Sequence, residues 1–235
     1  CYLQPILLLP YFAWLLYETR AQFFSPRVLL LWITPLLVAI PWMIRNQIVL
    51  GTPAFIRDNL GIELYISFND CTPAAFDQSG ALHCIQSTHP NSALNEATAV
   101  RDLGEYRYNQ SRLSIARTWI AGHPSAVISL IAQRTLLFWF PSHDGWPGYT
   151  LQRPRTWLLH ILTLLSFFGL WFSLRTRISG APLLAAFYIF FPPIYYNLLF
   201  VTRYRSPILW ITWLLAASLA AKLFPAHRLV PVPPR

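Results

Sequence analysis

Charged residues are scarce in this sequence and are absent from several long stretches. Only 11% of the 235 residues are Asp, Glu, Lys or Arg, whereas 55% are hydrophobic and the mean hydropathy is positive. A soluble domain has about 25% charged residues, so this composition excludes an ordinary soluble fold and predicts a protein embedded in a bilayer. Five stretches contain no charged residue: 1–17, 28–44, 156–174, 178–202 and 206–221.

The uncharged stretches have the length that a membrane helix requires. A helix rises about 1.5 Å per residue and the hydrocarbon core is about 30 Å thick, so roughly 20 residues span it. We therefore expect an all-α integral membrane protein with about five transmembrane helices. Eight of the nine acidic residues lie between positions 46 and 154, which indicates a water-facing, mainly helical insert. The expected organisation is two spans in 1–45, the insert in 46–154, and three spans with a tail in 155–235.

Motifs of soluble enzymes are missing too. The sequence has no Gly-x-Ser-x-Gly, His-Glu-x-x-His or P-loop motif, so soluble hydrolase and ATPase chemistry has no residues to perform it. The expected spans contain no carboxylate, which argues against an ion-coupled transporter. The cations are distributed around the apolar stretches and do not form the basic patch that nucleic-acid binding needs. We expect no nucleic-acid partner and no cofactor.

The sequence also has no initiator methionine and no basic leader, because it opens with Cys1. Residues 1–17 therefore fit poorly to a signal peptide. We expect the sequence to begin inside a longer protein, whose N-terminal half would be a partner of this part.

Cysteine is scarce, with three residues in the chain. Cys71 and Cys84 both lie in the insert, on the oxidising side, where a disulfide closing a loop of roughly 14 residues would contribute about 3 kcal/mol. A zinc site that adds His83 and His89 is the alternative, although no Cys-x-x-Cys pair or standard ligand spacing is present. We expect the disulfide and no metal site, with Cys1 left over.

Cations in the short loops predict the orientation of the chain. Short loops rich in Lys and Arg face the cytoplasm. With five spans, seven cations fall on that face: Arg20, Arg27, Arg175, Arg177, Lys222, Arg228 and Arg235. Residues 46–154 and the loop with Arg203 and Arg205 are then extracytoplasmic. This pair breaks the positive-inside pattern, which makes it a functional candidate, although anchoring to lipid phosphates is the simpler interpretation.

Residues 123–141 are apolar and almost long enough to span the membrane as well. Arg134 lies in the middle of this segment, where an unpaired charge is costly. We therefore expect a helix that lies in the membrane interface, with Pro124 in its first turn and Trp139 at headgroup depth.

Another amphipathic helix is expected just before this segment. Ser92 is a suitable cap for its start, and Gly122 marks its end. Its apolar residues recur at helical spacing: Leu103, Tyr106, Leu113, Ala116 and Ile120. Its basic residues are expected to form a solvated or headgroup-facing surface: Arg107, Arg112 and Arg117.

Two prolines are expected to disturb the fourth span. Pro192 and Pro193 should kink or break it, because proline removes a helical hydrogen bond. A break there would open a polar crevice near Arg203 and Arg205, since irregular backbone at membrane depth is tolerated where it lines a cavity. Asn197 would then bind a polar headgroup or hydrogen-bond a neighbouring helix.

Four segments form an ordered set that covers most of positions 41–217: PWMIRNQIVLGTPAFIRDNLGIELYISFND, HPNSALNEATAVRDLGEYRYNQSRLSIARTWIAGHP, RTLLFWFP and FPPIYYNLLFVTRYRSPILWITWLLAA. The set resembles the C-terminal half of bacterial polytopic glycosyltransferases of the GT-C type, relatives of the protein O-mannosyltransferases and the lipid A aminoarabinose transferase. The last segment is the most telling, because an Arg-Tyr-Arg-x-Pro element after an aromatic, proline-containing span is typical of these enzymes.

The resemblance implies a GT-C-like fold and a specific chemistry. Such enzymes move a sugar from a polyprenyl-phosphate carrier to a lipid, glycan or protein acceptor on the extracytoplasmic face of a bacterial plasma membrane. Arg203 and Arg205 would hold the carrier phosphate and stabilise it as it leaves, because arginine binds phosphate oxygens bidentately and stays charged at membrane depth. Tyr204, Asn197 and Glu63 are candidate residues of the substrate cavity.

The catalytic acid of that family is expected upstream. It lies in the first extracytoplasmic loop and would deprotonate the acceptor hydroxyl, and nothing in this sequence matches that loop. Asp58 and Glu63 are the acids nearest a membrane exit, but RDNLGIEL resembles scaffold. We therefore expect the donor-side part of such an enzyme, inactive by itself and surrounded by membrane lipid. The alternative is a non-catalytic membrane binding or scaffold protein that docks a partner through residues 46–154.

Overall fold

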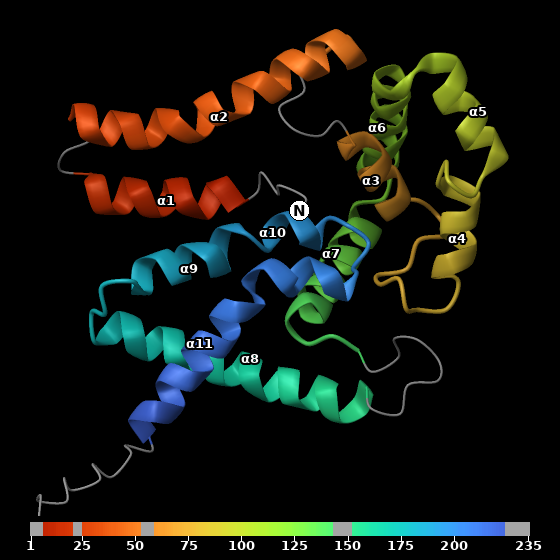
Figure 1. Ribbon diagram of the computed structural model, residues 1–235. Coiled ribbons are helices and arrows are strands. Elements are labelled where there is room, and N and C mark those ends of the chain that lie inside the picture. Colours follow the sequence, from red (N-terminus) through yellow and green to blue (C-terminus); the bar gives the residue numbers. More distant parts are fainter. Residues whose placement is uncertain (1–6, 21–24, 53–58, 143–151, 224–235) are drawn as a thin grey trace, which may run out of the picture.

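The computed structural model describes residues 7–20, 25–52, 59–142 and 152–223. Within these ranges the regular structure is helical, apart from an isolated parallel bridge between Ala75 and Phe200 (Figure 1). The helices are α1 (Leu8–Thr19), α2 (Pro26–Leu50), α3 (Leu60–Ser67), α4 (Ala81–Thr88), α5 (Leu94–Leu103), α6 (Glu105–Gly122), α7 (Pro124–Trp139), α8 (Gln152–Arg175), α9 (Ala181–Phe190), α10 (Pro193–Tyr196), the 3-10 turn η2 (Thr202–Arg205) and α11 (Ser206–Leu223). The all-α prediction is confirmed.

Among the described residues, three helices are long and apolar enough to cross a membrane: Pro26–Leu50, Pro154–Arg175 and Thr202–Leu223. They coincide with three of the five stretches predicted to span. The other two stretches give shorter helices in the described residues, since α1 has 12 residues and the apolar helix at Ala181–Tyr196 is interrupted. The count of five spans therefore stays a prediction.

The predicted break in the fourth apolar stretch is present. Helix α9 ends at Phe190 and α10 begins at Pro193. The ring of Pro193 has no N–H to continue the helical hydrogen bonds and crowds the preceding turn. After α10 the chain runs without a helix to η2, which carries Arg203 and Arg205.

The C-terminal helices pack around an apolar core. Phe138 from α7 and Ile208, Ile211 and Leu215 from α11 are buried in it. Gly169 brings α8 close to the backbone of α11, because a Cβ at this position would overlap the carbonyl oxygen of Leu215. Small residues at helix contacts of this kind are typical of membrane bundles, where close backbone approach replaces the hydrophobic effect.

Helices α1 and α2 pack less extensively than the C-terminal helices. Helix α1 packs mainly against α9, and α2 lies beside α1 (Figure 1). Most of the apolar side chains of α2 are exposed, for example Val38 at 71% and Ile48 at 78%. An apolar helix exposed to this degree needs lipid or another protein segment around it.

The insert is divided differently from the prediction. The single helix expected before residue 123 is split at Gly104, whose φ of 76° lies in the left-handed region, into α5 and α6. Ser92 does not cap it, because its hydroxyl donates to the carbonyls of Ile85 and His89. The apolar periodicity runs on through Gly104, which is why the sequence pattern did not reveal the break.

The prediction that Arg112 is solvated is wrong. Its Nε lies 2.7 Å from Glu96 Oε2, and the Tyr108 hydroxyl donates to the same oxygen at 2.7 Å. Burial, together with the hydrogen bond to Glu96, raises the pKa of Tyr108 to about 12. Arg107 and Arg117 are exposed as expected. Arg112 differs because α5 packs against α6 and places the carboxylate of Glu96 beside it.

Helix α7 turns its charged residue into the protein. It begins at Pro124, as predicted. Arg134 is fully buried and donates to the carbonyl of Ser67, with its guanidinium 4.9 Å from the centre of the Phe68 ring. Burial lowers the pKa of Arg134 to about 10, so it is still a cation at neutral pH. The opposite face of α7 exposes apolar residues such as Ile128.

Cations lie at both ends of the apolar helices, and one set of these ends lies opposite the insert. The C-terminal end of α1, the N-terminal end of α2, the α8–α9 turn and the C-terminal end of α11 lie on one side of the molecule, on the left in Figure 1. Helices α3 to α6 lie on the opposite side. The ends on the first side carry the described members of the cation set that predicted orientation: Arg20, Arg27, Arg175, Arg177 and Lys222. Arg228 and Arg235 lie outside the described residues.

Candidate functional site

A pocket of about 380 Å³ lies where the first turns of α8 and of η2–α11 meet the chain that follows α7. Three arginines line it: Arg155 from α8, and Arg203 and Arg205 from η2. Asp77, from the loop before α4, is the one acid among its described lining residues. The other lining residues are the hydroxyl residues Ser142, Thr156, Thr202 and Ser206, and the apolar residues Phe138, Pro141, Leu159, Phe200 and Leu209.

Arg205 is buried and held in one position. Its Nη1 donates to the carbonyl of Trp139 at 2.7 Å, and its Nη2 donates to the hydroxyls of Thr163 at 2.7 Å and Thr212 at 3.2 Å. The guanidinium also lies 5.4 Å from the centre of the Trp139 ring, within the range of a cation–π contact. All these partners are neutral, so the positive charge of Arg205 stays uncancelled in the pocket wall.

The hydroxyls around Arg205 continue into a polar layer across α8, α9 and α11. The Tyr188 hydroxyl donates to Ser166 Oγ at 3.0 Å and lies 3.0 Å from Thr212 Oγ1. Ser166 Oγ donates to the carbonyl of Thr163 at 2.7 Å. Buried polar groups are tolerated among apolar helices when they are hydrogen-bonded in this way. Arg205 is thus a structural tie between three helices as well as a pocket residue.

Arg203 and Arg155 differ from Arg205 because both are exposed. Neither forms a hydrogen bond or an ion pair with the described part of the chain, and the guanidinium of Arg203 lies 5.9 Å from the Tyr204 ring. A 3-10 turn has about three residues per turn, so side chains two positions apart point in different directions. The geometry leaves the donors of Arg203 and Arg155 for a ligand.

The insert fixes the segment that leads to η2. The Phe200 N–H donates to the Ala74 carbonyl and the Phe76 N–H donates to the Phe200 carbonyl, both at 3.0 Å. The Leu199 N–H donates to the hydroxyl of Ser67 at 2.8 Å. The end of α3 and the loop after it therefore fix the position of the segment directly before η2, which carries Arg203 and Arg205.

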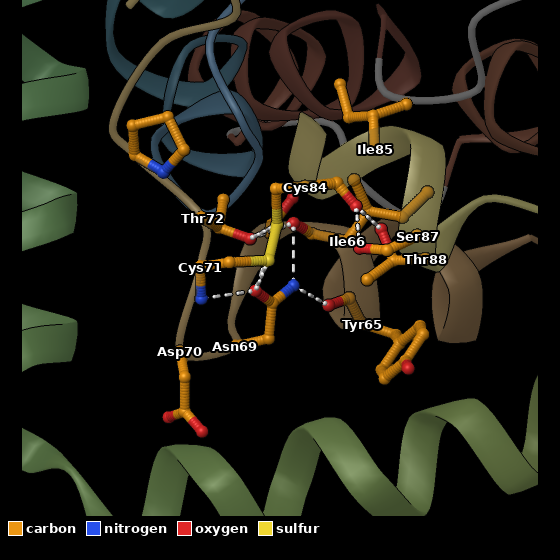
Figure 2. The surroundings of a disulfide bond; sticks show 12 residues. Tyr65, Ile66, Asn69, Asp70, Cys71, Thr72, Cys84, Ile85, Ser87 and Thr88 are labelled. Carbon is orange, nitrogen blue, oxygen red and sulfur yellow. Dashed lines mark hydrogen bonds between the residues drawn. A yellow bond between two sulfur atoms is a disulfide. The ribbon is translucent and has the colours of Figure 1, made fainter. Parts of the chain in front are cut away.

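Cys71 and Cys84 form the expected disulfide (Figure 2). Asn69 lies beside it and accepts a hydrogen bond from the Cys71 N–H at 3.0 Å. The pairing removes the thiolates that the zinc alternative needs, and the described ranges contain no other group of His, Cys, Asp and Glu able to hold a metal. The loop that the disulfide closes contains Asp77, which accepts a 2.7 Å hydrogen bond from Ser142.

The three residues predicted to share a substrate cavity with the arginines are not among the described residues that line the pocket. The ring of Tyr204 packs against that of Tyr195, with 4.8 Å between the ring centres. Asn197 donates to a backbone carbonyl of α10 at 2.9 Å, and Glu63 accepts a 3.0 Å hydrogen bond from an asparagine side chain. Asp58 lies outside the described residues.

Arg155 is the pocket arginine that the sequence analysis did not predict. It directly precedes the uncharged stretch 156–174, where a flanking arginine ordinarily anchors a helix to lipid headgroups. The available signal was topological: with five spans, Arg155 and Arg203 flank helices at the same membrane face.

Comparisons of the chain with protein-family models, with curated proteins and with solved structures found no match. The resemblance to GT-C glycosyltransferases therefore stays a prediction. The structural evidence on function is the pocket and the charged residues that line it.

Proposed function

We propose that the chain is the donor-side part of a membrane glycosyltransferase that moves a sugar from a polyprenyl-phosphate carrier to an extracytoplasmic acceptor. One observation carries this proposal: the pocket combines Arg203 and Arg205 with an apolar wall, at the ends of two helices long enough to cross a membrane. A phosphate joined to a prenyl chain needs both features, since arginine binds the phosphate and the apolar wall adjoins the chain.

The two arginines have different roles in this proposal. Arg203 is exposed and contacts the carrier phosphate directly, by the paired hydrogen bonds that a guanidinium forms with phosphate oxygens. Arg205 is a fixed charge in the pocket wall, because both of its Nη atoms donate to protein groups. A preorganised charge stabilises the phosphate leaving group as negative charge develops on it.

The orientation belongs to the same proposal. The insert and the pocket face the extracytoplasmic side of a bacterial plasma membrane, and the chain crosses it about five times. The grouping of the basic helix ends opposite α3 to α6 supports this orientation (Figure 1). The carboxylate that activates the acceptor comes from upstream sequence, which makes this part inactive by itself.

The test is polyprenyl-phosphate binding by the full membrane protein, wild type against Arg203→Ala. We expect affinity to fall by at least about tenfold, because a charge-assisted hydrogen bond to the phosphate is lost. Arg117→Ala is the matched control, because Arg117 is an exposed arginine on α6 and does not line the pocket.

Undiminished binding in a folded Arg203→Ala variant would contradict the proposal. Arg203 would then be a headgroup anchor, and docking through residues 46–154 would become the better account of the protein. Arg205→Ala is a weaker test, because this change also removes the hydrogen bonds that join three helices.

A further inference from the structure

The pocket holds a second exposed arginine, supplied by a helix other than the one that carries Arg203. We propose that Arg155 and Arg203 together select a terminal lipid phosphate, a monoester, over a phosphodiester. This inference rests on the proposed function, because it specifies which phosphate the same pocket holds best. The sugar-loaded carrier is a phosphodiester and the carrier left after transfer is a monoester, so the pocket binds the released carrier more tightly.

The charges of the pocket match a dianion. Three arginines against one aspartate give the described lining residues a net charge of +2. A phosphate monoester carries a charge of about −1.5 to −2 at pH 7. A phosphodiester has lost one ionisable hydroxyl and carries a single negative charge. Arg155, the second exposed arginine, therefore complements the extra negative charge of the monoester.

The hydrogen-bond donors lead to the same selection. Both Nη atoms of Arg205 are engaged by protein groups, and its Nε is buried without a hydrogen-bond partner in the described residues. Arg203 and Arg155 keep their donors exposed. A guanidinium binds a pair of phosphate oxygens. The two unesterified oxygens of a diester satisfy one such fork, whereas the three of a monoester allow both arginines to bind.

The remaining walls place the phosphate between these arginines. Asp77, held by Ser142, repels an anion from the side of the insert. The apolar residues Leu159 of α8 and Leu209 of α11 give the first carbons of a lipid chain a surface to pack on. The ligand class is therefore a lipid-linked phosphate monoester.

The experiment uses the full protein in a maltoside detergent, which contains no phosphate, and two probes, decyl phosphate and decyl methyl phosphate. Titration calorimetry at pH 7.5 measures their affinities for the wild type, Arg155→Gln and the control Arg117→Gln. We expect the wild type to bind decyl phosphate about tenfold more tightly than the diester, the worth of one charge-assisted hydrogen bond. Arg155→Gln should lose this preference, mainly by weaker binding of the monoester, and the control should keep it.

Each other outcome has a definite meaning. Equal affinities in the wild type, or a preference that survives Arg155→Gln, would overturn the selection by Arg155 and leave the proposed function standing. Failure of both probes to bind the folded wild type would overturn the two together. Inorganic phosphate, titrated in parallel, must bind more weakly than decyl phosphate; equal affinity would overturn the assignment to a lipid. Thermal unfolding of each variant shows that the compared proteins are folded.

Discussion

Two arginines withdrawn from solvent, one in the insert and one among the C-terminal helices, are stabilised in different ways. Arg112 contacts the carboxylate of Glu96. Arg205 contacts a carbonyl, two hydroxyls and an aromatic ring. An ion pair cancels its own charge, whereas a cation held by neutral dipoles keeps it. Of these two regions, the one around Arg205 is the one suited to an anionic ligand.

The distribution of acids explains this difference. Eight of the nine Asp and Glu residues lie between positions 46 and 154, and the apolar stretches after residue 155 contain none. Arg112 in the insert has a carboxylate partner nearby, whereas Arg205 among the apolar helices depends on threonine and backbone oxygens. Proximity in the fold matters too, because Arg134, also in the insert, is held by a backbone carbonyl and an aromatic ring. Substitutions in the two regions should therefore fail in different ways.

The largest effect is expected from Arg205→Met. The change removes hydrogen bonds to Trp139, Thr163 and Thr212 and leaves their oxygens buried, which should lower the free energy of unfolding by about 3 kcal/mol or more. Chemical unfolding in detergent measures the loss. Arg205→Lys is the companion variant and should recover only part of it, because an ammonium cannot reproduce the guanidinium fork. Unchanged stability in Arg205→Met would mean that this arginine does not tie the helices.

A smaller loss is expected from Glu96→Gln in the insert. The neutral side chain leaves Arg112 and Tyr108 without their charged acceptor. We expect the free energy of unfolding, measured by chemical unfolding, to fall by about 2 kcal/mol. This is less than the 3–5 kcal/mol lost when a fully buried pair is broken, because 15% of the Arg112 side chain is exposed.

A second change tests the origin of this loss. Adding Arg112→Met to Glu96→Gln should restore part of the stability, since no unpaired charge remains. A double variant less stable than Glu96→Gln would show that the unpaired charge of Arg112 is not the cause of the loss. No such rescue exists for Arg205, which has no acid partner among the described residues to remove.

The smallest effect on stability is expected from Arg203→Gln. Arg203 is exposed and makes no hydrogen bond to the described residues, so the free energy of unfolding should change by less than about 0.5 kcal/mol. Measured beside Arg205→Met in the same unfolding experiment, it separates a ligand-binding arginine from a structural one. A loss as large as that of Arg205→Met would contradict the separation.

The apolar helices were predictable because their signal is local. A run without charges predicts a membrane helix whatever surrounds it, and Pro192–Pro193 predicts an interruption by covalent geometry alone. Arg203 and Arg205 were found as cations on the wrong side of the predicted topology. The neighbouring sequence is sufficient for the helices and the interruption, whereas the two arginines also require the predicted topology of the whole chain.

The pocket was only partly predictable because its contacts are distant in sequence. Arg205 is fixed by Trp139 and Thr163, 66 and 42 positions away. Tyr204, a predicted residue of the substrate cavity, adjoins both arginines in sequence, yet its ring packs against Tyr195. Arg155 lines the same pocket as Arg203 because of how α8 packs near η2. A local pattern contains no information on such packing.

The disulfide between Cys71 and Cys84 has a consequence for biogenesis. Disulfides persist outside the cytosol, whereas cytosolic reductants keep thiols free. A chain whose insert faced the cytosol would therefore keep both cysteines reduced and lack the cross-link that closes the loop of Asp77. Formation of the bond therefore depends on the side of the membrane that the insert faces, and without the bond the pocket wall that contains Asp77 would lose this support.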